Sequence, residues 1–202
     1  SEYGKYYSAF DDKVHEGISY NDYSLWDTFR AFHPLMTLLE PELTGNWITG
    51  LLQMYKEGGW MPMWPNPSYT NIMIGTHADA LIADAYMKGI RNYDTDLAYE
   101  AMRKNAMVPP NCDTQRRYGD RDRWTSFEAR AGASFYHTIG YVPDDKTAES
   151  VSRTLEYAYD DWCIAQVAKE MGKMDDYKSL MQWSQNYKNI YNTEKGFMLP
   201  RK

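Results

Sequence analysis

Six segments of this sequence carry apolar residues at every third or fourth position, and this periodicity is the feature that most constrains the fold. The first stripe comprises Leu25, Phe29, Phe32, Met36 and Leu39. The segments predict helices over residues 25–40, 42–58, 77–88, 95–107, 148–171 and 174–191. No run of residues predicts a strand. We therefore expect an all-α chain built from three antiparallel helix pairs.

Proline and capping residues set the predicted helix ends. Ser24 precedes Asp27 by three positions, which is the spacing of a capping box, and Thr76 and Asp79 repeat this spacing at the third helix. Pro41 is expected to close the first helix. The segment 60–67 holds three prolines and is expected to be non-helical. The polar stretch before residue 145 lacks clear periodicity, apart from a short helix expected within 127–136.

The composition is that of one soluble globular domain. Of the 202 residues, 43% are hydrophobic and 25% are charged, which argues against disorder, and no apolar run is long enough to span a membrane. A net charge of −6 without a basic patch argues against nucleic acid as a partner. Two cysteines cannot form a disulfide framework. The 18 tyrosines and 7 tryptophans, against 6 phenylalanines, favour a half-wet aromatic surface such as a ligand cleft.

The start of the first predicted helix carries residues that suit a sugar. Trp26, Arg30 and His33 are four and then three positions apart, so a continuous helix would place them on one face beside an acid. An indole can cover the C–H face of a sugar, and a carboxylate such as Asp27 can bind its hydroxyl groups. The alternative is that Asp27 only caps the helix and interacts with its dipole.

A second aromatic candidate lies on the proline-rich segment, which carries Trp60 and Trp64. A stiff loop presents an aromatic platform at low entropic cost, so Trp64 is a candidate for stacking on a sugar. The alternative is a loop that fills a gap in the core.

Two further polar residues belong to the third predicted helix. His77 lies in its first turn, where the helix dipole disfavours an imidazolium, so we expect a neutral ring that donates one hydrogen bond and accepts another. A lone histidine is more often structural than functional. Asp84 precedes Lys88 by four residues, and an ion pair between them accounts for its presence.

The long fifth helix carries Glu156 and Asp160, two like charges four positions apart. One interpretation is that Arg153 offsets this repulsion through a contact with Glu156. The other is an acidic patch that faces a cleft and meets hydroxyl groups, a cation or an arginine. No motif of a nucleophile, a phosphate loop or a zinc site is present.

Four blocks of sequence combine these residues. They are YSLWDTFR at 23–30, MIGTHA at 73–78 running into IADAYMKG at 82–89, TLEYAYDDW at 154–162, and GFM at 196–198. In this order they resemble the signatures of glycoside hydrolase family 92, the calcium-dependent exo-acting α-mannosidases. The resemblance covers nearly the whole chain.

The resemblance implies a catalytic domain in the form of an (α/α)₆ toroid, of which residues 1–202 would form about half. It implies an inverting mechanism, in which one acid protonates the leaving oxygen and another activates water. The family's blocks for this acid and base come later in the sequence and are not found before Lys202. This chain alone is therefore expected to lack both, and most of the calcium ligands are expected to lie elsewhere, with none assigned here.

We therefore expect an exo-α-mannosidase segment, of α-1,2 type, that acts on terminal mannose of N-glycans. The residues expected to contact mannose are Trp26, Asp27, Trp64 and His77, with support from Arg30, Asp84, Glu156 and Asp160. The resemblance implies a periplasmic, secreted or cell-surface protein of a glycan-degrading bacterium. A non-catalytic mannose-binding module and a mere scaffold are the alternatives. Half a toroid would expose an apolar face, so we also expect self-association.

Overall fold

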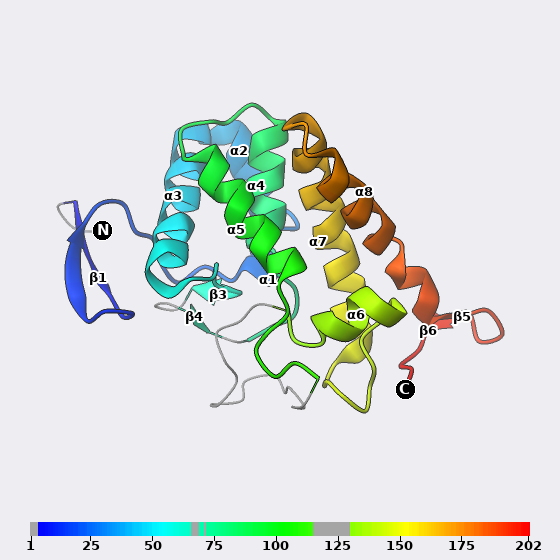
Figure 1. The fold of residues 1–202 in the computed structure, drawn as a ribbon. Helices are drawn as coiled ribbons and strands as arrows, with labels where there is room; N and C mark the ends of the chain where they lie inside the picture. The colour runs from blue at the N-terminus through cyan, green and yellow to red at the C-terminus, as the bar shows by residue number, and fades with distance from the viewer. Residues whose placement is uncertain (1–3, 66–68, 71, 115–129) are drawn as a thin grey trace.

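The computed structural model describes residues 4–65, 69–70, 72–114 and 130–202 of the chain (Figure 1). Its helices are α1 (Leu25–Thr28), α2 (Phe32–Leu39), α3 (Pro41–Gly58), α4 (Ala78–Met87), α5 (Thr95–Met107), α6 (Ala133–Ile139), α7 (Ser150–Glu170), α8 (Met174–Trp183) and the 3₁₀ helix η1 (Asn186–Ile190). Its strands are β1 (Lys5–Ser8), β2 (Lys13–Glu16), β3 (Trp64–Pro65), β4 (Tyr69–Thr70), β5 (Tyr191–Asn192) and β6 (Phe197–Met198).

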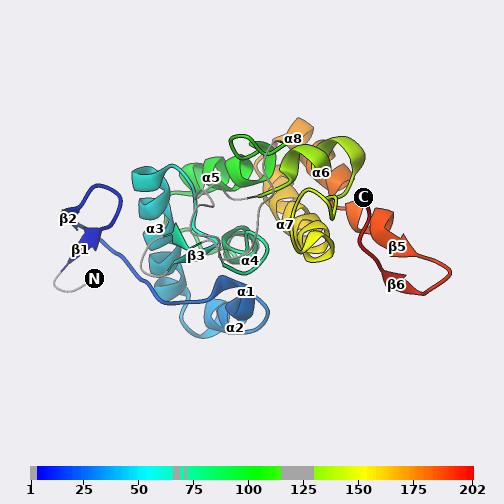
Figure 2. The same ribbon diagram turned by 90° about the horizontal axis from the view of Figure 1, so that it is seen from below.

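Helix α2 packs against α3 and α7 against α8, while α4 and α5 contact each other less than each contacts α7. Helix α4 lies in the middle, with α3, α5, α7 and the α1–α2 segment around it (Figure 2). It is suited to this place because it is rich in small and apolar residues on all sides, and seven of its ten residues are buried. The predicted class, all-α with antiparallel helix pairs, is confirmed.

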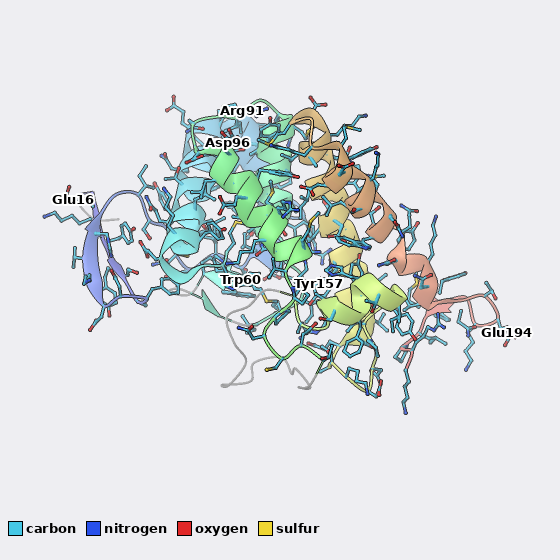
Figure 3. All side chains as sticks on the ribbon, in the orientation of Figure 1. Glu16, Trp60, Arg91, Asp96, Tyr157 and Glu194 are labelled. Carbon is cyan, nitrogen blue, oxygen red and sulfur yellow. The ribbon has the colours of Figure 1, made fainter. Side chains whose placement is uncertain are left out.

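One main core holds these helices together. It gathers side chains that are almost completely buried, among them Leu25, Ile48, Leu51, Leu81, Ile82, Met102, Ile164 and Leu180. A smaller cluster of Tyr136, Val142 and Tyr157 joins α6 to the first half of α7, and Tyr157 is labelled beside α6 in Figure 3. The α7 helix therefore belongs to both clusters and connects the two ends of the molecule.

The prediction of one continuous helix over residues 25–40 is wrong, because α1 ends at Thr28 and α2 begins at Phe32. Pro34 explains the break. Inside a continuous helix it would clash with the carbonyl group of residue 30 and would leave that group unpaired. As the third residue of α2 it lies in the first turn, where no backbone N–H is needed. Pro41 likewise begins α3 as its first residue.

The expectation that the chain has no strands is also wrong, since three two-stranded hairpins are present in the described part. In the first, Tyr7 pairs with Val14. Glu16 and Glu194 mark two hairpins that project from opposite ends of the helical body (Figure 3). Their strands contain two or four residues and are largely exposed, so they carry no alternating apolar pattern that could have predicted them.

Other boundaries differ by a few residues. The last predicted helix, 174–191, ends at Trp183, and a 3₁₀ turn follows it. The short helix expected within 127–136 is α6, which begins at Ala133, while residues 127–129 lie outside the described part. Segment 60–65 is non-helical as predicted, and the end of that segment, 66–67, also lies outside. Among the helices described, none has the length and apolar character needed to cross a membrane.

His33 occupies an unusual environment in the core. Its side chain is buried beside the rings of Tyr23, Phe32 and Trp47, and neither ring nitrogen has a hydrogen-bond partner among the described residues. Burial lowers the pKa of His33 to about 4. The helix break at 29–31 turns this residue away from Trp26 and Arg30, so the prediction that the three share one face is wrong for His33.

We expect the stability of the chain to fall as the pH drops from about 6.5 to about 4, in part because of His33. In this window the unfolded chain binds a proton at His33 that the folded chain excludes, which costs about 3 kcal/mol in total. Replacing His33 by Phe should remove this share of the pH dependence. Urea unfolding of both proteins between pH 4 and pH 7 measures the difference, and parallel stability curves would contradict the assignment of a neutral, buried ring.

Candidate functional site

A cavity of about 590 Å³ opens between the α1–α2 segment, α4 and α7. The residues that line it are Phe29, Arg30, Pro34, Ala80, Ala83, Asp84, Met87, Glu156, Tyr159, Trp162, Cys163 and Gln166. Most of the wall is apolar or aromatic, and the charged groups on it are Arg30, Asp84 and Glu156. Such a cavity, with few polar groups on an aromatic wall, has the general character of a small-molecule site.

Glu156 is the best-connected charged residue of this cavity. Its Oε1 atom accepts hydrogen bonds from Trp26 Nε1 at 3.3 Å and from Arg30 Nη2 at 3.2 Å. Its side chain is 18% exposed, so the carboxylate is held by the protein and still accessible from the cavity. The prediction of a contact between Arg153 and Glu156 is wrong. Arg153 is buried and donates to the Ala148 carbonyl and the Tyr157 hydroxyl instead.

Arg30 is held by aromatic rings as well as by Glu156. Its guanidinium carbon lies 4.5 Å from the centroid of the Trp26 ring and 4.7 Å from that of Phe29. These are cation–π distances, and the planar group is thereby fixed in orientation. Trp26 and Arg30 thus lie together as their spacing predicts, and they meet an acid from α7.

His77 lies behind Glu156. Its side chain is 1% exposed and its ring stacks on Phe29, with 3.9 Å between the centroids. The Nδ1 atom is 2.9 Å from Asp160 Oδ1, and the Nε2 atom is 3.6 Å from Glu156 Oε2. The predicted site residues His77, Glu156 and Asp160 are therefore brought together in one chain of contacts.

Asp160 does not face the cavity but is buried below it. Its Oδ2 atom accepts hydrogen bonds from the Thr76 backbone N–H at 2.7 Å and from the Thr76 hydroxyl at 3.2 Å. Burial alone would raise the pKa of Asp160, but the charge and hydrogen bond of His77, with Arg130 nearby, hold it below its usual value. Asp160 therefore remains ionised. The acidic-patch interpretation placed both Glu156 and Asp160 at a cleft, and it is wrong for Asp160.

A buried ionic cluster supports this arrangement. Arg130 is completely buried, donates to Asp161 and to the Thr76 hydroxyl, and lies 3.5 Å from Asp79 Oδ2. Burial raises the pKa of Asp161 to about 6 and that of Asp79 well above its usual range. One guanidinium thus faces more carboxyl groups than its charge can balance, and the neighbouring charge of Asp160 adds to the effect of burial on the pKa of Asp79.

Asp27 is exposed, and its predicted capping role is not observed. Ser24 forms no side-chain cap, and among the described residues no hydrogen bond to the Asp27 side chain is present. The carboxylate is therefore free at the surface, one residue from Trp26. This excludes a shielded position, and contact with mannose stays a prediction.

The remaining candidates differ in their positions. Asp84 lines the cavity and forms the predicted ion pair with Lys88, at 2.8 Å. Trp64 is half-buried in β3 and does not line the cavity, so the structure does not bring it to Glu156. Its contact with a sugar stays a prediction.

Sequence reasoning missed several residues of this site. Tyr159, Cys163 and Gln166 follow Glu156 along α7 at helical spacing, a signal that the sequence offers and that predicts one common face. Gly75 has a different signal. Its φ is +92°, and a Cβ there would lie 2.4 Å from His77 Nε2, so a glycine lets the backbone approach the ring. Arg130 follows an aperiodic stretch and offered no signal.

The described residues do not provide a set of ligands for the expected calcium ion. Within the described ranges, no group of three or more His, Cys, Asp or Glu side chains could hold a metal ion. The acids around Arg130 do not fit calcium, because a guanidinium already occupies the space between them. No calcium ligand is therefore assigned to this part of the chain.

Comparison with known proteins gives consistent results. The model of the glycosyl hydrolase family 92 catalytic domain matches residues 1–202. An uncharacterized secreted glycosidase of Arthroderma benhamiae is 36% identical over 156 residues, which cover 71% of this chain and 18% of that protein.

Two solved structures from Bacteroides thetaiotaomicron are also similar. The family GH92 inverting mannosidase BT2199 shares 39% identity with a TM-score of 0.86, over 98% of this chain and 25% of its own. The family GH92 α-mannosidase BT3965 shares 34% identity with a TM-score of 0.83, over 100% of this chain and 25% of its own, and it is also known in complex with mannoimidazole. The chain thus spans about a quarter of the length of these solved relatives.

Proposed function

Because the chain belongs to glycosyl hydrolase family 92, with the helix pairs of about half an (α/α)₆ toroid, we propose that it is part of the catalytic domain of an exo-α-mannosidase. The substrate is terminal mannose of N-glycans, in α-1,2 linkage, and hydrolysis proceeds with inversion. The observation that carries this proposal is the Glu156 carboxylate, fixed by Trp26 and Arg30 at the wall of a cavity. The mannosidase names of two similar structures support the choice of sugar.

This chain supplies one side of the sugar pocket. A carboxylate that is already oriented by the protein accepts hydrogen bonds from sugar hydroxyl groups at little entropic cost. The free carboxylate of Asp27 offers further acceptors, and the half-buried Trp26 ring, which has Arg30 over one face, would meet C–H groups with its other face. This division of roles suits mannose, which has polar edges and apolar faces.

Other parts of the protein supply the chemistry of bond cleavage. An inverting hydrolase places its acid and its base roughly 6.5–9.5 Å apart, so that a water molecule fits between base and sugar. We assign neither group to residues 1–202, since Glu156 is occupied by Trp26 and Arg30. We propose that most ligands of the calcium ion, which the family resemblance implies, likewise lie elsewhere. The secreted relative supports an extracellular or periplasmic location.

We expect Asp27→Asn to lower kcat/KM for an α-mannoside by at least about tenfold in the full-length enzyme. The variant removes a charge-assisted acceptor, which is worth roughly 1.5–3 kcal/mol when it binds a hydroxyl group. The melting temperature should barely change, because Asp27 is exposed and caps nothing through its side chain. Steady-state kinetics and thermal unfolding measure the two quantities.

Asp96→Asn is the matched control, since Asp96 is an exposed acid in the first turn of α5. It should leave both activity and stability unchanged. Full activity of the Asp27 variant would show that this residue does not bind the sugar. Titration of the full-length protein with mannobiose, beside a hydrolysis assay, distinguishes the alternative of a non-catalytic binding module, which would bind without turnover.

We also propose that the isolated chain self-associates through the outer face of α2. Leu35, Leu38 and Leu39 are 51%, 70% and 63% exposed, and they lie on neighbouring positions of the helix. Leu38→Lys should shift sedimentation at high concentration towards the monomer. Phe197→Ser, at an equally exposed apolar residue on β6, should not. A wild-type chain that sediments as a single monomer at all concentrations would contradict this proposal.

A further inference from the structure

His77 has a carboxylate group at each of its ring nitrogens. Asp160 Oδ1 lies 2.9 Å from Nδ1, which is a hydrogen-bond distance, and Glu156 Oε2 lies 3.6 Å from Nε2. Within the described residues, Nε2 has no hydrogen-bond partner although it is buried. The nearest group that could become its partner is the Glu156 carboxylate.

The ring has little freedom to choose another orientation. One of its faces is covered by Phe29, and Gly75 lies so close that a Cβ there would be 2.4 Å from Nε2. Asp160 is fixed in turn by the backbone N–H and the hydroxyl of Thr76. The line from Asp160 through His77 to Glu156 is therefore set by the packing.

The carboxylates of Asp160 and Glu156 determine which protonation state of the ring can form hydrogen bonds at both nitrogens. Asp160 takes the proton on Nδ1, and a neutral ring would then present the lone pair of Nε2 to a second carboxylate. A ring with a proton on both nitrogens instead attracts both acids. The dipole of α4, whose N-terminus disfavours a cation by about 0.3–1 kcal/mol, opposes this attraction.

The charged groups around the ring come from every neighbouring element. Helix α7 contributes Asp160 and Glu156, and Arg30 follows α1 at the far side of Glu156. Asp79 of α4 and Arg130, which precedes α6, lie behind Asp160 and contact Thr76. Asp160 and Glu156 lie 2.9 Å and 3.6 Å from the ring nitrogens. Arg30 contacts Glu156, and Arg130 contacts Thr76.

We propose that His77 is a positioning residue, an imidazolium that bridges Asp160 and Glu156 and thereby orients the Glu156 carboxylate towards the ligand. This proposal deepens the proposed function and rests on it for the identity of the ligand. A carboxylate has about four lone-pair sites. Trp26 and Arg30 use those of Oε1, and a proton on His77 Nε2, now 3.6 Å from Oε2, would take one more, which leaves one directed site for a sugar hydroxyl group.

Nitrogen NMR of the 202-residue chain tests the protonation directly. At pH 7 we expect the ¹⁵N signals of His77, assigned with a His77→Gln variant, to show two protonated ring nitrogens. His33 and His137 provide neutral references in the same spectrum, because burial lowers the pKa of each to about 4. In Glu156→Gln, which removes the second acid, fewer His77 rings should carry both protons at pH 7 than in the wild type. A neutral His77 in the wild type at pH 7 would overturn the proposal.

Binding measurements on the full-length protein test the positioning. Asp160→Asn keeps an acceptor for Nδ1 but removes the charge, and we expect it to weaken mannoimidazole binding at least tenfold and to raise KM more than it lowers kcat. Asp113→Asn is the matched control. Asp113 is also a buried acid that accepts backbone N–H groups, those of Gly132 and Ser134, but it touches neither His77 nor Glu156.

Equal affinities of the Asp160 and Asp113 variants would overturn the positioning role. If the wild-type protein does not bind mannoimidazole at all, the proposed function fails, and the NMR result still decides the state of His77. If Asp160→Asn does not fold, the wild-type and Glu156→Gln spectra carry the test alone.

Discussion

Arg130→Met is expected to lower the free energy of unfolding by roughly 3–5 kcal/mol, the largest stability effect we anticipate from one substitution in this chain. Arg130 is completely buried and interacts with Asp161, Asp79 and the Thr76 hydroxyl. Without the guanidinium, carboxyl groups that are also buried lose their counter-charge. For a domain of this size the melting temperature should fall by about 10 °C, which thermal unfolding would detect.

Arg103→Met provides the control for this prediction. Arg103 forms an ion pair with Asp176, but its side chain is 48% exposed, and such pairs contribute about 0–1 kcal/mol. A double variant, Arg130→Met with Asp161→Leu, should recover part of the loss because it removes one stranded acid. Equal destabilisation by Arg130→Met and Arg103→Met would mean that the buried cluster is not the source of stability described here.

Glu156→Gln is expected to reduce kcat/KM of the full-length enzyme by about a hundredfold or more. The loss has two causes. The ligand loses a charge-assisted acceptor, and Arg30 and His77 lose the carboxylate that fixes them. Because the side chain is only 18% exposed, this acceptor lies in a drier environment than that of Asp27, and its effect should be larger.

Steady-state kinetics with an aryl α-mannoside would measure this loss, and Glu170→Gln is the control on the same helix. Glu170 is exposed at the last position of α7 and does not line the cavity. Its replacement should leave kcat/KM unchanged. An active Glu156→Gln enzyme would show that the sugar is bound by other groups and that Glu156 only joins α7 to α1.

Local sequence rules predicted the parts of this structure that depend on neighbouring residues. The spacing of Trp26 and Arg30 placed them together, and the spacing of Asp84 and Lys88 gave their ion pair. The helices themselves followed from apolar periodicity. The apolar periodicity continues across Pro34, but this proline interrupts the helix between α1 and α2, so the prediction of one continuous helix was wrong.

The site depends on contacts between distant residues, which such rules cannot supply. One interpretation paired Glu156 with Arg153, three residues away, and the other left its partner open as a hydroxyl group, a cation or an arginine. Glu156 in fact binds Arg30 and Trp26, which precede it by 126 and 130 positions. His77 was expected to be governed by the dipole of its helix, while the structure surrounds it with acids from α7. The tertiary arrangement of α1, α4 and α7 decides these partners, and no local pattern contains it.

The break between α1 and α2 has a consequence for motion. Helix α1 is a single turn, and an isolated turn has few hydrogen bonds to lose when it opens. Although Leu25 anchors this turn in the core, its backbone amides are therefore expected to exchange hydrogen faster than those in the middle of α7, which is a helix of 21 residues.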